Sequence, residues 1–217
     1  MNFLQSVICS FSIIIAAIIA AWRFGNIHPV FRPFIFCIWL ACFNELLSFI
    51  LVRSHLSNVV NANIYVLAES LLICWQFRRW GLFGKQTKIY HLLLGLLSLI
   101  WVSENFIFFS IFQFSSWFRI FYSFIIVLMA ISLLNGHIMR ERGALLKNPL
   151  VLICLAYIIY YTFKVLVEVF WVYGLNESTT FQIKIYFILD CVNLFCNLIY
   201  ALAVLWMPTK HRFTLQF

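Results

Sequence analysis

Long, uninterrupted apolar runs fill this chain of 217 residues and restrict it to few folds. A helix needs about 20 apolar residues to cross the hydrocarbon core of a bilayer. The runs are continuous, whereas the strands of a membrane barrel would alternate apolar and polar residues. We therefore predict an all-α membrane protein, a seven-transmembrane-helix bundle that forms one domain over residues 1–217. The predicted spans are residues 3–22, 32–52, 62–82, 88–108, 112–136, 149–173 and 181–206.

The composition excludes a sizeable soluble domain. Hydrophobic residues make up 65% of the chain and charged residues 10%, whereas a soluble domain carries roughly 25% charged residues. The net charge of +8 is spread over short loops, so we expect the lipid bilayer as the surrounding medium and no nucleic-acid partner.

Lys and Arg are unevenly distributed between the two sides of the predicted bundle. They are frequent in the tail and in the loops after the first, third and fifth spans, but rare in the other loops. Because cytoplasmic loops are enriched in Lys and Arg, we expect the N-terminus outside and the C-terminus in the cytoplasm. The segment Met1 to Ser6 has no basic residue, which favours an uncleaved first helix over a signal peptide. The basic residues concerned are Arg23, Arg32, Arg78, Arg79, Lys85, Lys88, Arg140, Arg142, Lys147, Lys210 and Arg212.

Five of the seven acidic residues lie inside the predicted spans, although an ionised group in hydrocarbon is costly. They are Glu45, Glu69, Glu104, Glu168 and Asp190. Only two bases, Arg119 and Lys164, lie well inside the same spans. Three acids would therefore lack a basic partner and must be protonated, hold a cation or meet water. In the expected orientation, all these charges lie in the outer half of the bundle or near its midplane.

Polar and aromatic residues recur at helical spacing in three of the spans, at steps of three, four or seven, which places them on one helix face. Such faces should turn into the bundle, because lipid offers them no hydrogen-bond partner. The three faces comprise Asn61, Tyr65, Glu69 and Gln76; Tyr157, Tyr161, Lys164, Glu168 and Trp171; and Tyr186, Asp190, Asn193, Asn197 and Tyr200.

A purely structural role for these residues stays open. Polar side chains also hold membrane helices together by hydrogen bonds, and this interpretation suits Asn193 and Asn197 best. Lys164 and Glu168, one turn apart, could equally form a simple ion pair.

We predict a polar cavity that opens to the outer side and binds or senses a small molecule. Arg119 and Lys164 would hold an anionic group, and tyrosines would supply hydroxyls and ring faces. Signalling would need a cytoplasmic or membrane partner, for which the basic segment 78–88 offers a surface. The predicted ligand-binding residues are Glu45, Tyr65, Glu69, Glu104, Arg119, Tyr161, Lys164, Glu168, Tyr186, Asp190 and Asn193.

A proton-coupled transporter is the first alternative, because unpaired acids can carry protons. A parallel repeat of three, one and three helices would suit it. The segments Ile64–Ser70 and Ile185–Cys191 each place a tyrosine four residues before an acid.

An intramembrane enzyme that modifies lipids with paired carboxylates is the second alternative, and the chain gives it less support. It contains no hydrolase, phosphate-binding or metalloprotease motif, and no histidine lies in the middle of a span. The cysteines lack the spacing of a metal site. We therefore predict no catalytic residue, no metal and no cofactor.

Four segments carry a family resemblance: Asn63 to Glu69 (NIYVLAE), Trp75 to Leu82, Lys164 to Gly174 (KVLVEVFWVYG) and Ala201 to Phe217 (ALAVLWMPTKHRFTLQF). They resemble small seven-helix integral membrane proteins of Bacteroidetes, and the likeness extends over nearly the whole chain. The resemblance implies the inner membrane of a Gram-negative cell, with the cavity opening to the periplasm. It implies no activity and no site residue.

Overall fold

The structure is a computed structural model that describes residues 3–84, 86–138, 147–172 and 179–209, without the side chains of residues 3–6 and 179–184. Its helices are α1 (Phe3–Phe11), α2 (Ile13–Arg23), η1 (Pro29–Phe31), α3 (Arg32–Arg53), α4 (Val59–Arg79), α5 (Thr87–Val102), η2 (Ser103–Phe108), α6 (Ser116–Ile138), α7 (Pro149–Val172) and α8 (Thr179–Trp206). Within these residues, six helices are long and apolar enough to cross a membrane, and Val7–Arg23 is a shorter apolar helix. This count fits the predicted bundle and indicates a multi-pass membrane protein.

Some residues used in the sequence predictions lie outside the described part of the chain. They are Met1, Asn2, Lys85, Arg140, Arg142, Gly174, Lys210, Arg212 and the rest of the C-terminal segment 210–217.

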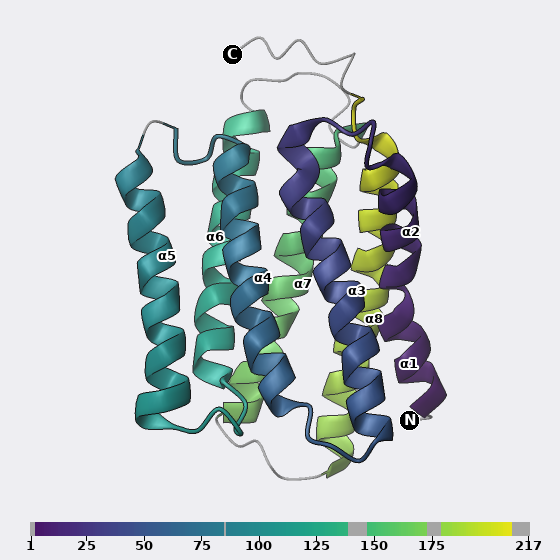
Figure 1. The fold of residues 1–217 in the computed structure, drawn as a ribbon, viewed down its shortest axis with the longest axis vertical. Coiled ribbons are helices and arrows are strands. Elements are labelled where there is room, and N and C mark those ends of the chain that lie inside the picture. The colour runs from purple at the N-terminus through teal and green to yellow at the C-terminus, as the bar shows by residue number, and fades with distance from the viewer. Residues whose placement is uncertain (1–2, 85, 139–146, 173–178, 210–217) are drawn as a thin grey trace.

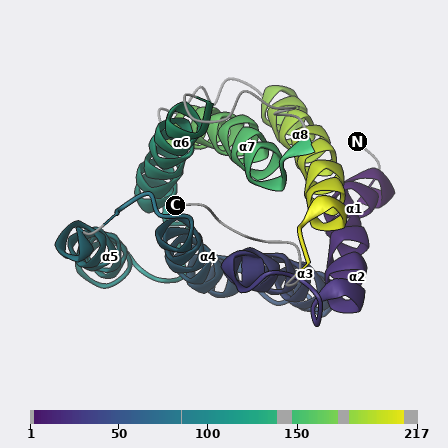
Figure 2. The ribbon, with the colours of Figure 1, turned by 90° about the horizontal axis from the view of Figure 1, so that it is seen from above.

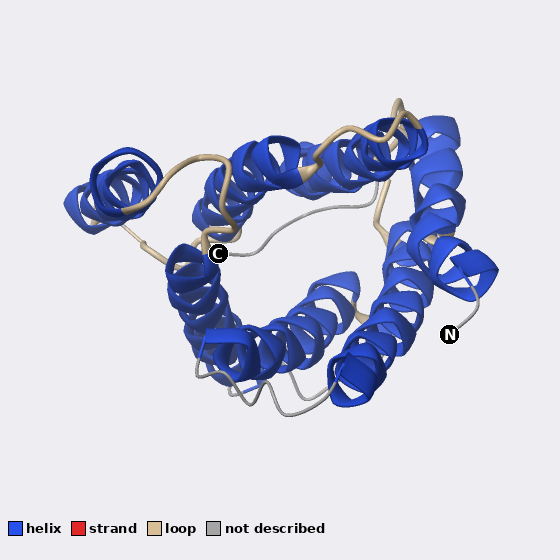
Figure 3. Cartoon of the chain, turned by 90° about the horizontal axis from the view of Figure 1, so that it is seen from below, coloured by secondary structure: helices blue, strands red, loops and turns tan. Residues whose placement is uncertain are grey.

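The described helices form a closed ring, and α5 stands outside it (Figure 2). The ring runs in chain order through α2, α3, α4, α6, α7 and α8, and α8 packs against α2 to close it. The long helices alternate in direction along the bundle (Figure 1), and α5 lies against the outer side of α4 and α6. Seen from the opposite end, the same ring encloses one common interior (Figure 3).

Apolar side chains fill the interior at the end of the bundle where α3 and α7 begin and α4 ends, and others cover the outer surface. Phe34, Phe77 and Ile153 are fully buried there. The outward faces expose large residues such as Leu92 and Phe106, which suit contact with lipid because lipid chains are themselves apolar.

The first predicted span, residues 3–22, is not one continuous helix. It breaks at Ser12, between α1 and α2, where the Ser12 hydroxyl donates to the Cys9 carbonyl at 2.6 Å. Such bonds from serine to the preceding turn bend helices. Asn197 on α8 donates to the same hydroxyl at 2.8 Å, so the bend is tied to the neighbouring helix of the ring.

The span predicted at residues 88–108 ends in η2, a π-helical turn. This wider turn carries Glu104 and Asn105 into buried positions beside α6. Asn63 of α4 then holds the following loop, since its amide donates to the carbonyls of Ile111 at 3.0 Å and Gln113 at 2.7 Å. These contacts fix the point where α6 begins.

At the upper end of Figure 1, polar side chains hold two more helix ends. The Gln76 amide accepts from the Phe34 backbone N–H at 2.7 Å and donates to the Val30 carbonyl at 3.0 Å. Arg23, at the end of α2, donates to carbonyls at the end of α8, including that of Met207 at 3.0 Å. A cation at a helix C-terminus is favourable, so Arg23 helps to close the ring.

Candidate functional site

Two adjoining cavities lie within the ring that the described residues form. The central cavity, of about 90 Å³, is lined by Glu45, Glu69, Tyr157, Tyr161, Asn193 and Tyr200, among others. The end cavity, of about 240 Å³, is lined by Asn44, Arg119, Lys164, Glu168, Trp171 and Tyr186, among others. Tyr65 and Tyr160 line both. A water needs about 10–15 Å³ of such space, so each cavity can hold several waters or part of a small ligand.

A hydrogen-bonded group from three helices lies where the cavities meet. The Glu69 carboxylate, on α4, accepts from the hydroxyls of Tyr65 at 2.7 Å and Tyr122 at 2.8 Å. The Lys164 ammonium, on α7, donates to the Tyr122 hydroxyl and lies 3.5 Å from Glu69 Oε2. Both oxygens of Glu69 are therefore occupied, and its charge is balanced by Lys164.

Aromatic rings surround the Lys164 ammonium. Its Nζ lies 5.4 Å from the ring centroid of Tyr160 and 5.5 Å from that of Tyr161, while it meets Tyr122 at the hydroxyl. The faces of aromatic rings attract cations, so these tyrosines help to stabilise a charge inside the bundle.

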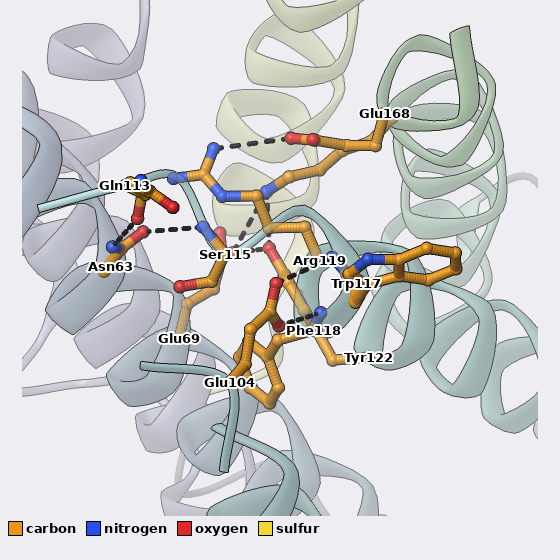
Figure 4. A network of polar contacts seen from close by, with 11 residues as sticks. Asn63, Glu69, Glu104, Gln113, Ser115, Trp117, Phe118, Arg119, Tyr122 and Glu168 are labelled. Atoms are coloured by element: carbon orange, nitrogen blue, oxygen red, sulfur yellow. Dashed lines mark hydrogen bonds and ion pairs between the residues drawn. The ribbon is translucent and has the colours of Figure 1, made fainter. Parts of the chain in front are cut away.

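Arg119 forms the second ion pair, with Nη1 3.4 Å from Glu168 Oε1 (Figure 4). The two side chains are 13% and 14% exposed. The other edge of the guanidinium, Nε and Nη2, is buried and finds no hydrogen-bond partner among the described residues. That edge is the one that binds a carboxylate or phosphate through two parallel hydrogen bonds.

The sequence left open a pair between Lys164 and Glu168, and the structure gives each a different partner. Lys164 points to Glu69 and Glu168 points to Arg119 within the described bundle. Lys164 therefore links α7 to α4, and Glu168 links α7 to α6 through Arg119. Neither ion pair lies within α7.

Glu104 does not line either cavity, contrary to its predicted place in the ligand site. Its carboxylate accepts from the backbone N–H groups of Trp117 at 3.0 Å and Phe118 at 2.6 Å (Figure 4). The first N–H groups of a helix lack partners within it and carry partial positive charge. Glu104 therefore caps α6, which accounts for one of the three acids that had no basic partner.

The other predicted site residues fall into three groups. Tyr65, Glu69, Arg119, Tyr161, Lys164 and Glu168 come together around the junction of the cavities. Glu45 and Asn193 line the central cavity, while Tyr186 lines the end cavity with its ring 6.1 Å from that of Trp171. Asp190 is half-buried on α8 and lines neither cavity.

The site prediction missed four tyrosines. Tyr122 links Lys164 to Glu69, and Tyr157, Tyr160 and Tyr200 line the central cavity. The spacing of two of them could have predicted their place in the site. Tyr122 lies one turn after Arg119 and Tyr160 lies one turn before Lys164, so each shares a helix face with a cation.

The described residues contain no group of three His, Cys, Asp or Glu side chains placed to hold a metal ion. No protein-family model, curated protein or solved structure matches the chain. The inference of function therefore rests on the geometry of the two cavities.

Proposed function

We propose that this chain is a multi-pass membrane protein that binds a small molecule through a carboxylate or phosphate group in the end cavity. Arg119 carries the proposal, because it lines this cavity and its buried Nε and Nη2 edge has no hydrogen-bond partner among the described residues. A buried donor without an acceptor costs about 1–3 kcal/mol. A ligand oxyanion at this edge would remove that cost.

Lys164 supports the same assignment. It lines the end cavity with Arg119, so an anion there meets two cations. Glu168 and Glu69 pair with these cations, which keeps the lining of the cavity near neutrality.

The orientation expected from the loops places the end cavity toward the outside, because α6 begins and α7 ends at the same end of the bundle (Figure 1). With the inner-membrane location that the family resemblance implies, the ligand enters from the periplasm. The bundle then acts as a receptor, and the basic segment 78–88 on the cytoplasmic side contacts a signalling partner.

A proton-coupled transporter is the second candidate, and the order of the ring favours it. Helices α2 to α4 and α6 to α8 occupy opposite halves of the ring with α5 outside (Figure 2), which is compatible with a repeat of three, one and three helices. A route through the bundle would have to pass Phe34, in the wall of the central cavity, and open the apolar packing around Phe77 and Ile153.

The experiment compares ligand-induced stabilisation in purified wild-type protein and in Arg119→Gln. Butyrate, succinate and inorganic phosphate are titrated while the melting temperature is recorded in detergent. We expect a saturable rise for wild type with at least one of these anions and none for Arg119→Gln. Arg53→Gln, at the exposed end of α3, is the matched control and should respond like wild type. Equal responses of wild type and Arg119→Gln would refute the proposal.

Uptake into proteoliposomes distinguishes the two candidates. Accumulation of the bound anion that needs a proton gradient identifies a transporter, whereas binding without accumulation identifies a receptor.

A further inference from the structure

We propose that the ligand is an amino carboxylate, a zwitterion whose ammonium group enters the central cavity and pairs with Glu45. The inference rests on the proposed binding of an anionic group at Arg119. The new element is a positive charge at the opposite end of the ligand, together with the residues of the central cavity that recognise this charge.

The central cavity is built for a cation. Two carboxylates and five tyrosines line it, and its described lining includes no Lys, Arg or His. Carboxylates attract an ammonium group directly, and the faces of tyrosine rings add to this attraction. An anion in this cavity would meet only like charge.

Glu45 is the carboxylate available to a ligand. Glu69 already receives the hydroxyls of Tyr65 and Tyr122 and pairs with Lys164. Glu45, on α3, is half-buried and forms no hydrogen bond or ion pair within the described residues.

Tyr157 gives independent support for a polar occupant. This residue is 3% exposed and lines the central cavity, and its hydroxyl has no hydrogen-bond partner in the part of the chain that the structure describes. A buried hydroxyl that lacks a partner is destabilising. An ammonium N–H or a ligand-bound water would satisfy it.

The two cavities adjoin, because Tyr65 and Tyr160 stand in the walls of both. Under this proposal these two side chains move apart, and a short chain reaches from Arg119 to Glu45. A zwitterion also adds no net charge to an interior whose Arg119 and Lys164 are already paired. A simple anion would instead add one negative charge to this interior, so it should bind less tightly than a zwitterion.

The test uses matched probes and wild-type protein in detergent. Glycine, 4-aminobutyrate and 6-aminohexanoate vary the distance between the charges, while butyrate and butylamine each lack one of them. One charge-assisted hydrogen bond is worth about 1.5–3 kcal/mol, so we expect the best amino carboxylate to bind about tenfold or more tightly than butyrate. Glu45→Gln should remove this advantage and leave the response to butyrate unchanged.

Tyr157→Phe is a second variant that keeps the ring and its packing. It should weaken binding of the amino carboxylate but not of butyrate, whereas Tyr90→Phe, outside the ring against Phe83, should change neither. If wild type binds butyrate as tightly as every amino carboxylate, the zwitterion is refuted and the anion site stands. Binding of the best amino carboxylate that is indifferent to Arg119→Gln also refutes it, and no response to any probe refutes both proposals.

Discussion

Lys164 and Glu69 form an ion pair from α7 to α4, with Nζ 3.5 Å from Oε2. Their side chains are only 8% and 11% exposed, and the Tyr122 hydroxyl accepts from Lys164 while it donates to Glu69. Three helices of the ring therefore depend on one buried pair of charges. Removing one partner of such a pair leaves the other without compensation.

Lys164→Met should lower the free energy of unfolding by about 3–5 kcal/mol, because it leaves Glu69 as an uncompensated buried charge. Glu69→Gln should cost less, since an amide oxygen can still accept from Tyr65 or Tyr122. Adding Glu69→Gln to Lys164→Met should restore part of the loss. Melting temperatures in detergent measure all three variants, and a Lys164→Met curve that matches wild type would show that the pair does not form.

Glu104→Ala should destabilise the protein by about 1–2 kcal/mol, the range for loss of a helix N-cap. The variant deprives the N–H groups of Trp117 and Phe118 of their acceptor at the start of α6. Glu104→Gln keeps one acceptor oxygen and should lose less. Because Glu104 lines neither cavity, ligand affinity measured at a temperature where the variant is folded should equal that of wild type. A selective loss of affinity would return Glu104 to the ligand site.

Gln76→Leu should lower stability by about 1–3 kcal/mol, because it leaves one buried and one part-buried backbone group without its partner. These are the N–H of Phe34 and the carbonyl of Val30, at the start of α3. Gln113→Leu, in an exposed position, is the control for added apolar surface. Thermal unfolding of the two variants side by side tests the contact, and equal melting temperatures would contradict it.

The convergence of polar faces could be predicted from the sequence because two simple constraints act together. A helical period places Tyr161, Lys164 and Glu168 on one side of α7, and lipid offers that side no partner. The structure accordingly turns all three toward the cavities.

The pairing of those residues could not be predicted. Whether Lys164 meets Glu168 or Glu69 depends on the order of the helices in the ring and on the rotation of α7, which spacing along one helix does not specify. The sequence also predicts Glu104 in the ligand site, because spacing along the chain does not specify which group its carboxylate meets. Its role as a cap follows from the π-helical turn η2 and from the way Asn63 holds the next loop.

His28, in the connection between α2 and η1, should make stability depend on pH. Burial disfavours the charged imidazolium and Arg79 repels it, so the pKa of His28 lies below its ordinary value of 6.5. The unfolded chain then takes up the proton at a higher pH than the folded protein does. Stability should therefore fall as the pH drops below about 6.5 and level off below the pKa of the folded state.

His28→Asn isolates this contribution, because asparagine does not titrate and its side-chain oxygen can still accept from the Val30 N–H, as His28 Nδ1 does at 3.4 Å. Melting temperatures at pH 7.5 and pH 5.5 give the comparison. The decrease on acidification should be larger for wild type than for His28→Asn, because only wild type gains a proton at this position on unfolding. An equal decrease in the two proteins would mean that the folded state accepts the proton on His28 as readily as the unfolded chain does.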